Sequence, residues 1–174
     1  MQKRRLVLVI ALFLLTVSVI ALSWYFSGQD VNQSNEESKF VAQVIENIIA
    51  QHFPVNHNDS FWRITFNMLL RKFAHFMEYY IIGAVICTTL NVLTRRVFIS
   101  SLSSGIICIV LAFADEYRQR FSQGRTPRIF DVKVDTCGAL LGILLITVAF
   151  IIYRYIQRLK LRIKELENCL GEND

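Results

Sequence analysis

The sequence predicts an all-α fold, a polytopic membrane bundle with four transmembrane helices. Hydrophobic residues make up 53% of the 174-residue chain, and its mean hydropathy is positive at +0.40. These residues are gathered into near-continuous runs, whereas a soluble helical domain of this length shows amphipathic stripes. Four runs are long enough to cross a bilayer. We therefore expect residues 1–174 to form a single membrane domain.

The first transmembrane helix is expected over residues 6–26, directly after the basic triplet Lys3 to Arg5. Its apolar run is too long for a signal peptide and no small-residue cleavage site follows, so we expect an uncleaved anchor. The basic triplet places the N-terminus in the cytoplasm. The remaining spans are expected at about 73–93, 97–114 and 134–153. An even number of spans returns the C-terminus to the cytoplasm of a bacterial cell, as a multi-pass protein of its membrane.

Two segments outside these spans have a recognisable character. Residues 27–73 are expected to form an extracytoplasmic loop with one or two interfacial amphipathic helices. The first would begin at the capping box of Ser34 and Glu37 and end at Pro54. The second would begin near Ser60 and be interrupted by Arg71 and Lys72, just before the next span. Residues 154–174 form a tail that is first basic and then acidic, and we expect it to be cytoplasmic.

The net charge of +5 does not indicate nucleic-acid binding, because the basic residues cluster beside apolar runs and no binding motif accompanies them. The partner that this pattern indicates is the lipid bilayer. The four cysteines have no disulfide or zinc spacing, and we expect them to be small buried hydrophobic residues. They are Cys87, Cys108, Cys137 and Cys169.

The most densely charged stretch, Ala114 to Gly142, joins the last two spans. Charge at a membrane boundary is costly and usually functional. At about 100° per residue, Asp131 and Asp135 share a helix face with Gly138 and Gly142. The glycines predict a close approach of a neighbouring helix.

A second polar group lies at the start of the second span, and the two groups fall at the same predicted membrane face. They could therefore meet in one pocket that binds a ligand. Its members would be Lys72, His75, Glu78, Tyr79, Asp115, Glu116, Gln119, Arg125, Asp131 and Asp135. A divalent metal is an optional cofactor, with His75, Glu116, Asp131 and Asp135 as its ligands. The alternative is a structural network in which opposite charges pair.

The stretches RKFAHFMEYYIIG and DEYRQRFSQGRTPRIFDVKVDTCGALLG resemble the VanZ-like family of small bacterial membrane proteins. The family pattern has Lys, His-Phe and Glu-Tyr at the start of one helix, then Asp-Glu, Gln, Gly-Arg, Asp and spaced Gly. It predicts a VanZ-like core over about 70–150. Where the family usually has Asn, this chain has Asp135, which could strengthen cation binding. The resemblance implies a link to teicoplanin resistance but supplies no biochemical activity.

Three functions are compatible with these features. The first is a non-enzymatic factor that binds an envelope component, such as a cell-wall precursor, or the glycopeptide itself at the outer membrane face. The second is a metal-assisted enzyme acting on a lipid-linked or cell-wall substrate, although no nucleophile motif assigns a catalytic residue. The third is a small transporter, which would need to form a homo-oligomer because four spans are few.

Overall fold

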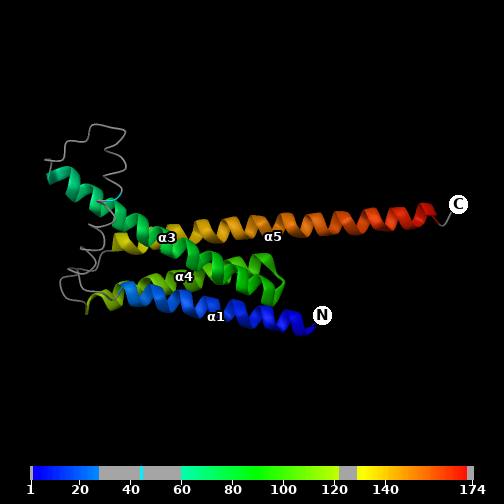
Figure 1. Cartoon of the computed structure of the whole chain (residues 1–174), viewed down its shortest axis with the longest axis horizontal. Coiled ribbons are helices and arrows are strands. Elements are labelled where there is room, and N and C mark those ends of the chain that lie inside the picture. The colour runs from blue at the N-terminus through cyan, green and yellow to red at the C-terminus, as the bar shows by residue number, and fades with distance from the viewer. Residues whose placement is uncertain (1, 28–43, 45–59, 122–128, 172–174) are drawn as a thin grey trace.

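A computed structural model of the chain describes residues 2–27, 44, 60–121 and 129–171, all of which are helical apart from short turns (Figure 1). It contains four long helices, and each has a segment long and apolar enough to cross a membrane. The predicted all-α bundle with four spans is confirmed. The helices are α1 (Gln2–Ser27), α3 (Ser60–Thr94), α4 (Val97–Gln119) and α5 (Ile129–Gly171).

The start of helix α3 differs from the one that the sequence predicted. The sequence predicted an interfacial helix broken at Arg71 and Lys72, followed by a separate span from residue 73. Instead α3 runs without a break from Ser60, and its apolar segment covers Met68–Thr94. Arginine and lysine are good helix formers, and the segment contains neither a proline nor an adjacent glycine. The charged pair therefore lies within a helix and does not end it.

Helices α3 and α4 are joined by a very short turn. The backbone of Arg95 is left-handed, with φ of 56°, and its amide donates to the carbonyl of Asn91 at 3.0 Å. The next amide, that of Arg96, donates to Thr94 Oγ1 at 3.1 Å. The hydroxyls of Thr94 and Ser100 lie 2.8 Å apart across the turn. These contacts fix the antiparallel arrangement of the two helices.

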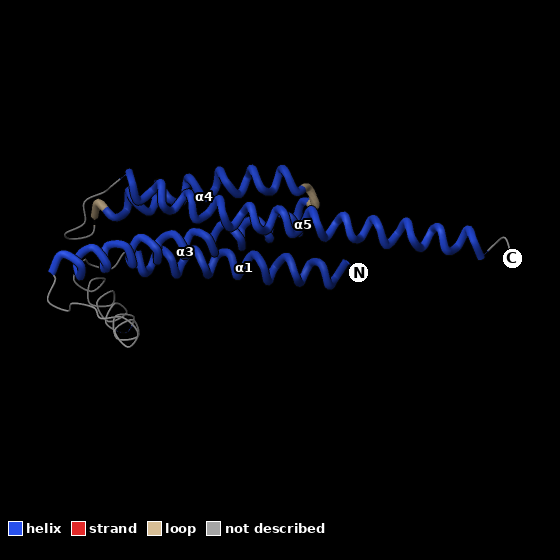
Figure 2. The backbone as a smooth tube through the Cα atoms, turned by 90° about the horizontal axis from the view of Figure 1, so that it is seen from above, coloured by secondary structure: helices blue, strands red, loops and turns tan. Residues whose placement is uncertain are grey.

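Helix α5 begins earlier and ends much later than the predicted span over 134–153. It starts at Ile129, with Asp131 in its first turn, and continues for 43 residues to Gly171. The segment predicted as a tail is thus the far end of the same helix. It projects well beyond the other helices (Figures 1 and 2). Charged residues alone do not end a helix, and none of the residues from 143 to 170 is proline or glycine.

The tightest packing is between α3 and α5. A Cβ at Gly138 would collide with the carbonyl oxygen of Phe76, and one at Gly142 with that of Tyr80. From the other side, a Cβ at Gly83 would lie 2.5 Å from the carbonyl oxygen of Ala139. These glycines allow the two backbones to touch, as small residues do in membrane bundles. The buried hydrophobic core lies around this crossing.

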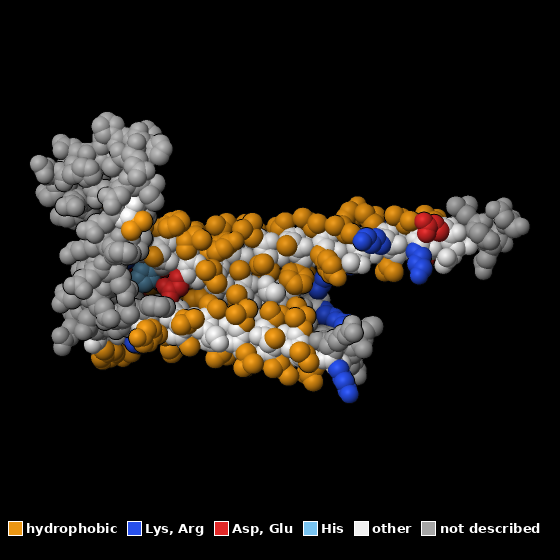
Figure 3. Space-filling view, in the orientation of Figure 1, with side chains coloured by type: hydrophobic (Ala, Val, Ile, Leu, Met, Phe, Trp, Pro, Cys, Tyr) orange, Lys and Arg blue, Asp and Glu red, His pale blue; other side chains and the backbone are white. Residues whose placement is uncertain are grey.

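Helix α1 packs on the rim of the bundle, mainly against α3. Most of its apolar side chains are exposed in the bundle, as Leu6 and Phe13 are. The hydroxyls of Thr16 and Thr89 lie 3.0 Å apart at the contact between α1 and α3. The face of the described bundle that Figure 3 shows is largely hydrophobic, which suits contact with lipid.

Several sequence expectations lie outside the described residues. They are the amphipathic helix between Ser34 and Pro54 and the expected pocket residue Arg125. The side chain of Cys169 also lies outside them. Of the other cysteines, Cys87 and Cys108 are buried as expected. The expectation for Cys137 was wrong, because it is exposed on the face of α5 turned away from the core.

Candidate functional site

Three helices bring acidic and polar side chains together at the end of the bundle opposite the N-terminus. Helix α3 supplies His75, Glu78 and Tyr79, and α4 supplies Asp115, Glu116 and Gln119. Helix α5 supplies Asp131 and Asp135. Asp115, Glu116, Gln119 and Asp135 are buried, although their side chains are charged or polar. Acidic and histidine side chains are visible at this end of an otherwise apolar surface (Figure 3). We call these eight residues the polar cluster.

Asp135 lies at the centre of the polar cluster and is only 3% exposed. Its Oδ1 lies 3.9 Å from His75 Nδ1. That distance is longer than a hydrogen bond, and this oxygen accepts no hydrogen bond from a residue that the structure describes. Electrostatic interactions link Asp135 with Asp115, Glu78, Asp131 and Glu116. A buried carboxylate oxygen with no hydrogen-bond donor is costly, so it is a natural point for a ligand to occupy.

His75 and Glu78 form the side of the cluster that faces α1. His75 Nδ1 lies 3.8 Å from Glu78 Oε2 within the same helix. Glu78 also accepts a hydrogen bond from the side chain of Ser23 on α1, a residue that sequence reasoning missed. Ser23 is 4% exposed. Because the helix contacts of α1 cannot be read from its uniform apolar run, no sequence signal identified Ser23.

Asp115 is held by its own helix. Its Oδ2 accepts a hydrogen bond of 3.1 Å from Gln119 Nε2, and its Oδ1 lies 3.6 Å from Arg118 Nη2. Arg118 also donates to the backbone carbonyl of Trp24 and lies over the Trp24 ring, with 5.8 Å between Cζ and the ring centre. Sequence reasoning missed Arg118. Its position three residues after Asp115 is the signal that could have found it.

Tyr79 connects the polar cluster with the hydrophobic core. It is 1% exposed and belongs to the hydrophobic core. It interacts electrostatically with Asp115, Asp135 and Glu78.

Two predicted members are not placed in the cluster. Lys72 Nζ lies 3.9 Å from the centre of the Phe130 ring, so its charge rests on an aromatic face and makes no described ion pair with the carboxylates. Arg125 lies outside the described residues. The sequence spacing placed Lys72 near the start of the second span, but the described side chains that lie within 4 Å of the cluster's carboxylates are those of His75 and Arg118.

Carboxylates are the most numerous groups of the polar cluster, with five among its eight residues. Four of them interact electrostatically with the fifth, Asp135. His75 and Arg118 lie within 4 Å of carboxylates of the cluster. Within the described ranges, no three His, Cys, Asp or Glu side chains have an arrangement that could hold a metal ion. The predicted set of His75, Glu116, Asp131 and Asp135 thus shares a region but not a coordination geometry.

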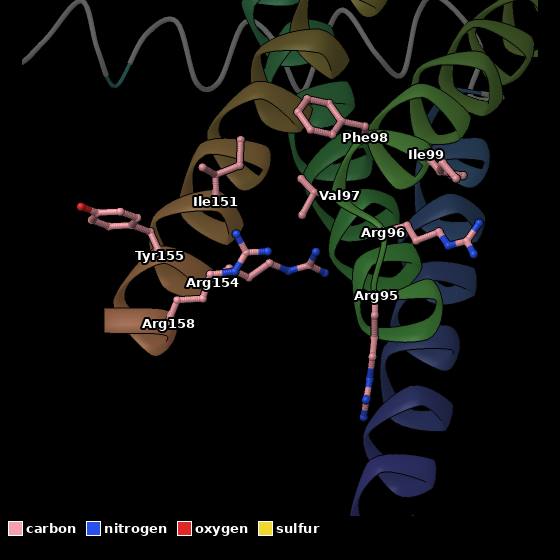
Figure 4. Close-up of a pocket in the computed structure, with 9 residues that line it drawn as sticks. All are labelled: Arg95, Arg96, Val97, Phe98, Ile99, Ile151, Arg154, Tyr155 and Arg158. Atoms are coloured by element: carbon pink, nitrogen blue, oxygen red, sulfur yellow. The ribbon is translucent and has the colours of Figure 1, made fainter. Parts of the chain in front are cut away.

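A groove of about 530 Å³ lies at the other end of the bundle, where α4 begins and α5 leaves it (Figure 4). Its lining combines hydrophobic side chains with four arginines, namely Arg95, Arg96, Arg154 and Arg158. Arg154 and Arg158 extend from α5 toward the turn between α3 and α4 (Figure 4). Basic residues at the ends of apolar spans mark the level of the lipid headgroups. The groove and the polar cluster thus lie near opposite membrane faces.

Comparison with known proteins gives a family for most of the chain. A family model described as VanZ/LLP1 matches residues 10–152. The match covers α3, α4, most of α1 and the part of α5 that packs in the bundle. It therefore includes every residue of the polar cluster. Neither the curated proteins nor the solved structures gave a match.

Proposed function

Because this chain belongs to the VanZ/LLP1 family, we propose that it alters sensitivity to glycopeptide antibiotics such as teicoplanin. The polar cluster would be the binding site through which it acts. Its ligand would be an envelope component, such as a cell-wall precursor, or the antibiotic itself. The buried Asp135, with one oxygen that accepts no hydrogen bond from the described residues, carries this proposal.

The carboxylates of the cluster suit a cationic group of the ligand. An ammonium group can donate to several carboxylate oxygens at once and offset their mutual repulsion. Asp135 Oδ1, which accepts no hydrogen bond from the described residues, would accept from it. We therefore expect the bound part of the ligand to carry a primary amine. A structural network would instead need each carboxylate to be matched by a fixed cation.

We further propose that the protein lies in the bacterial cytoplasmic membrane with both termini in the cytoplasm. Lys3 to Arg5 before the first span support this orientation, which places the polar cluster at the outer face. A cysteine introduced at Gln123, with Cys137 and Cys169 replaced by serine, should react with a membrane-impermeant thiol reagent in intact cells. In a second variant that keeps Cys169 as the accessible thiol, we expect labelling only after permeabilisation. The reverse pattern would place the cluster in the cytoplasm.

Alanine variants of His75, Glu116 and Asp131 test the binding proposal. We expect each to insert at normal abundance and keep its melting temperature in detergent, but to lose protection against teicoplanin. The matched control is Glu165→Ala, which removes an exposed carboxylate on α5 far from the cluster and should change neither property.

Two outcomes would contradict the proposal. Full protection in all three variants would show that the cluster does not bind the relevant ligand. Lost protection that follows lost abundance would assign the cluster a structural role, because removing one member of a buried charge pair costs about 3–5 kcal/mol. Ion flux in vesicles, or turnover of a lipid-linked substrate by the purified protein, would identify a transporter or an enzyme instead.

A further inference from the structure

Helix α5 carries a free hydrophobic seam where it leaves the bundle. Apolar residues recur along it with alternating spacings of four and three. The members are Ile152, Ile156, Leu159, Ile163, Leu166 and Leu170. Five of them have described and exposed side chains, at 52% for Ile152, 43% for Ile156, 40% for Leu159, 55% for Ile163 and 64% for Leu166. Alternating spacings of three and four define the a and d positions of a coiled coil.

The seam lies on the side of α5 that its own bundle leaves uncovered. Ala139 and Ile143 are buried in the core, and Ile146 packs against it. At about 100° per residue, the seam points about 150° from this core face and about 60° from Gly138 and Gly142, which lie against α3. Because the described seam side chains are exposed, a second helix can lie along them without displacing α3 or α4.

The seam belongs largely to a part of α5 outside the membrane. A bilayer is spanned by about 20 residues, whereas α5 has 43. Basic and acidic residues separate the seam positions beyond Tyr153, so this part of the helix is amphipathic. An isolated helix in water gains little stability of its own, and most helices are stabilised by burying their apolar face. The seam thus requires a partner.

We infer that the partner is a second copy of this chain, paired through α5 in a parallel, two-stranded coiled coil. All copies insert into the membrane in one orientation, so their projecting helices run parallel. Isoleucine occupies the central a positions 156 and 163, and leucine occupies the central d positions 159 and 166, whereas the two ends have Ile152 at d and Leu170 at a. The central distribution favours two parallel strands over higher oligomers.

Charges beside the seam fit the same partner. With Ile156 and Ile163 at a, Arg162 is at g and Glu167 is at e of the following heptad. In a parallel coiled coil, a g residue faces the e residue five positions later on the other chain. Arg162 of each copy would therefore pair with Glu167 of the other. The seam is short, at about three heptads, but confinement of both copies to one membrane raises their effective concentration.

Cysteine cross-linking in native membranes tests this inference. In a background with Cys137→Ser and Cys169→Ser, single cysteines would replace Leu159, Leu166 or, as a control, Leu161. Leu161 is as exposed as the seam residues, at 62%, but lies at f on the opposite side. Under mild oxidation we expect disulfide-linked dimers at positions 159 and 166, with at least tenfold less at 161. Equal cross-linking at all three positions, or none at 159 and 166, would overturn the inference.

A charge exchange gives a second test, in which the cysteine position is kept fixed and only the charges beside the seam change. In the Leu159→Cys protein, Arg162→Glu should reduce the dimer fraction several-fold by placing like charges opposite each other. Adding Glu167→Arg should restore it. A single variant that cross-links as well as the double variant would exclude the predicted pairing. Positions 159, 162 and 167 all lie outside the bundle, so the outcome of this experiment is independent of whether the polar cluster binds a ligand.

Discussion

Replacing Gly142 with leucine should separate α3 from α5 and destabilise the protein by about 3 kcal/mol. Even one added methyl group would collide with the carbonyl oxygen of Tyr80 and lie 3.1 Å from the amide nitrogen of Ala84. Both are backbone atoms of a packed helix, so neither can rotate away. The same crossing of α3 and α5 also sets the distance between Asp135 and His75. We therefore expect thermal unfolding in detergent at a lower temperature, together with lower membrane abundance.

A matched pair of alanine variants separates this packing effect from helix propensity. Alanine is favoured over glycine in a helix by about 0.5–1 kcal/mol. Gly105 on α4 has no atom within 4 Å of an added Cβ, so Gly105→Ala should be neutral or slightly stabilising. Gly142→Ala should be destabilising, because the collision outweighs the gain in propensity. Equal shifts in melting temperature for the two variants would show that α3 and α5 do not touch at Gly142.

The second large effect is expected from Arg118→Ala. Arg118 pairs with the buried Asp115 and binds the end of α1 through the Trp24 carbonyl. Loss of a hydrogen bond to a charged group, such as the one from Arg118 to the Trp24 carbonyl, costs about 1.5–3 kcal/mol. The variant should therefore melt at a lower temperature. It should also loosen α1, and cross-linking between cysteines placed at Thr16 and Thr89, whose hydroxyls are 3.0 Å apart, measures that contact.

Arg120→Ala is the control for this experiment. Arg120 lies two residues further along the chain, is exposed, and stacks on the Tyr117 ring with 5.6 Å between Cζ and the ring centre. An exposed contact of this kind is worth about 0.5–1 kcal/mol. Arg120→Ala should therefore leave the cross-link between α1 and α3 unchanged. If Arg118→Ala behaves like this control, Arg118 does not anchor α1.

The sequence predicts the four spans because apolar runs of about 20 residues have few other structures in a membrane protein. It does not predict where α3 and α5 begin and end. Arg71, Lys72 and the charged residues after Tyr153 interrupt the hydrophobic pattern, but they do not interrupt the backbone hydrogen bonds. Hydropathy reports contact with lipid, whereas only proline, glycine or a cap ends a helix.

The same distinction explains the candidate site. Helical spacing places His75 and Glu78 on one face of α3, and the order of the spans places them at the same membrane face as Asp135. Spacing does not give the rotation of each helix in the bundle. Lys72 was therefore assigned to the cluster although it lies over Phe130. Arg118 was overlooked, because its role depends on where α1 packs.

The length of α5 has a mechanical consequence. At 1.5 Å per residue its 43 residues form a rod about 65 Å long, with Asp135 in its second turn. Pivoted near Asp135, a tilt of 5° would move the opposite end by roughly 5 Å. Occupancy of the polar cluster at one membrane face could thus change the separation of two α5 ends beyond the other face. A single rigid lever would carry the signal across the bilayer, and its contacts with α3 and α4 would shift as it tilts.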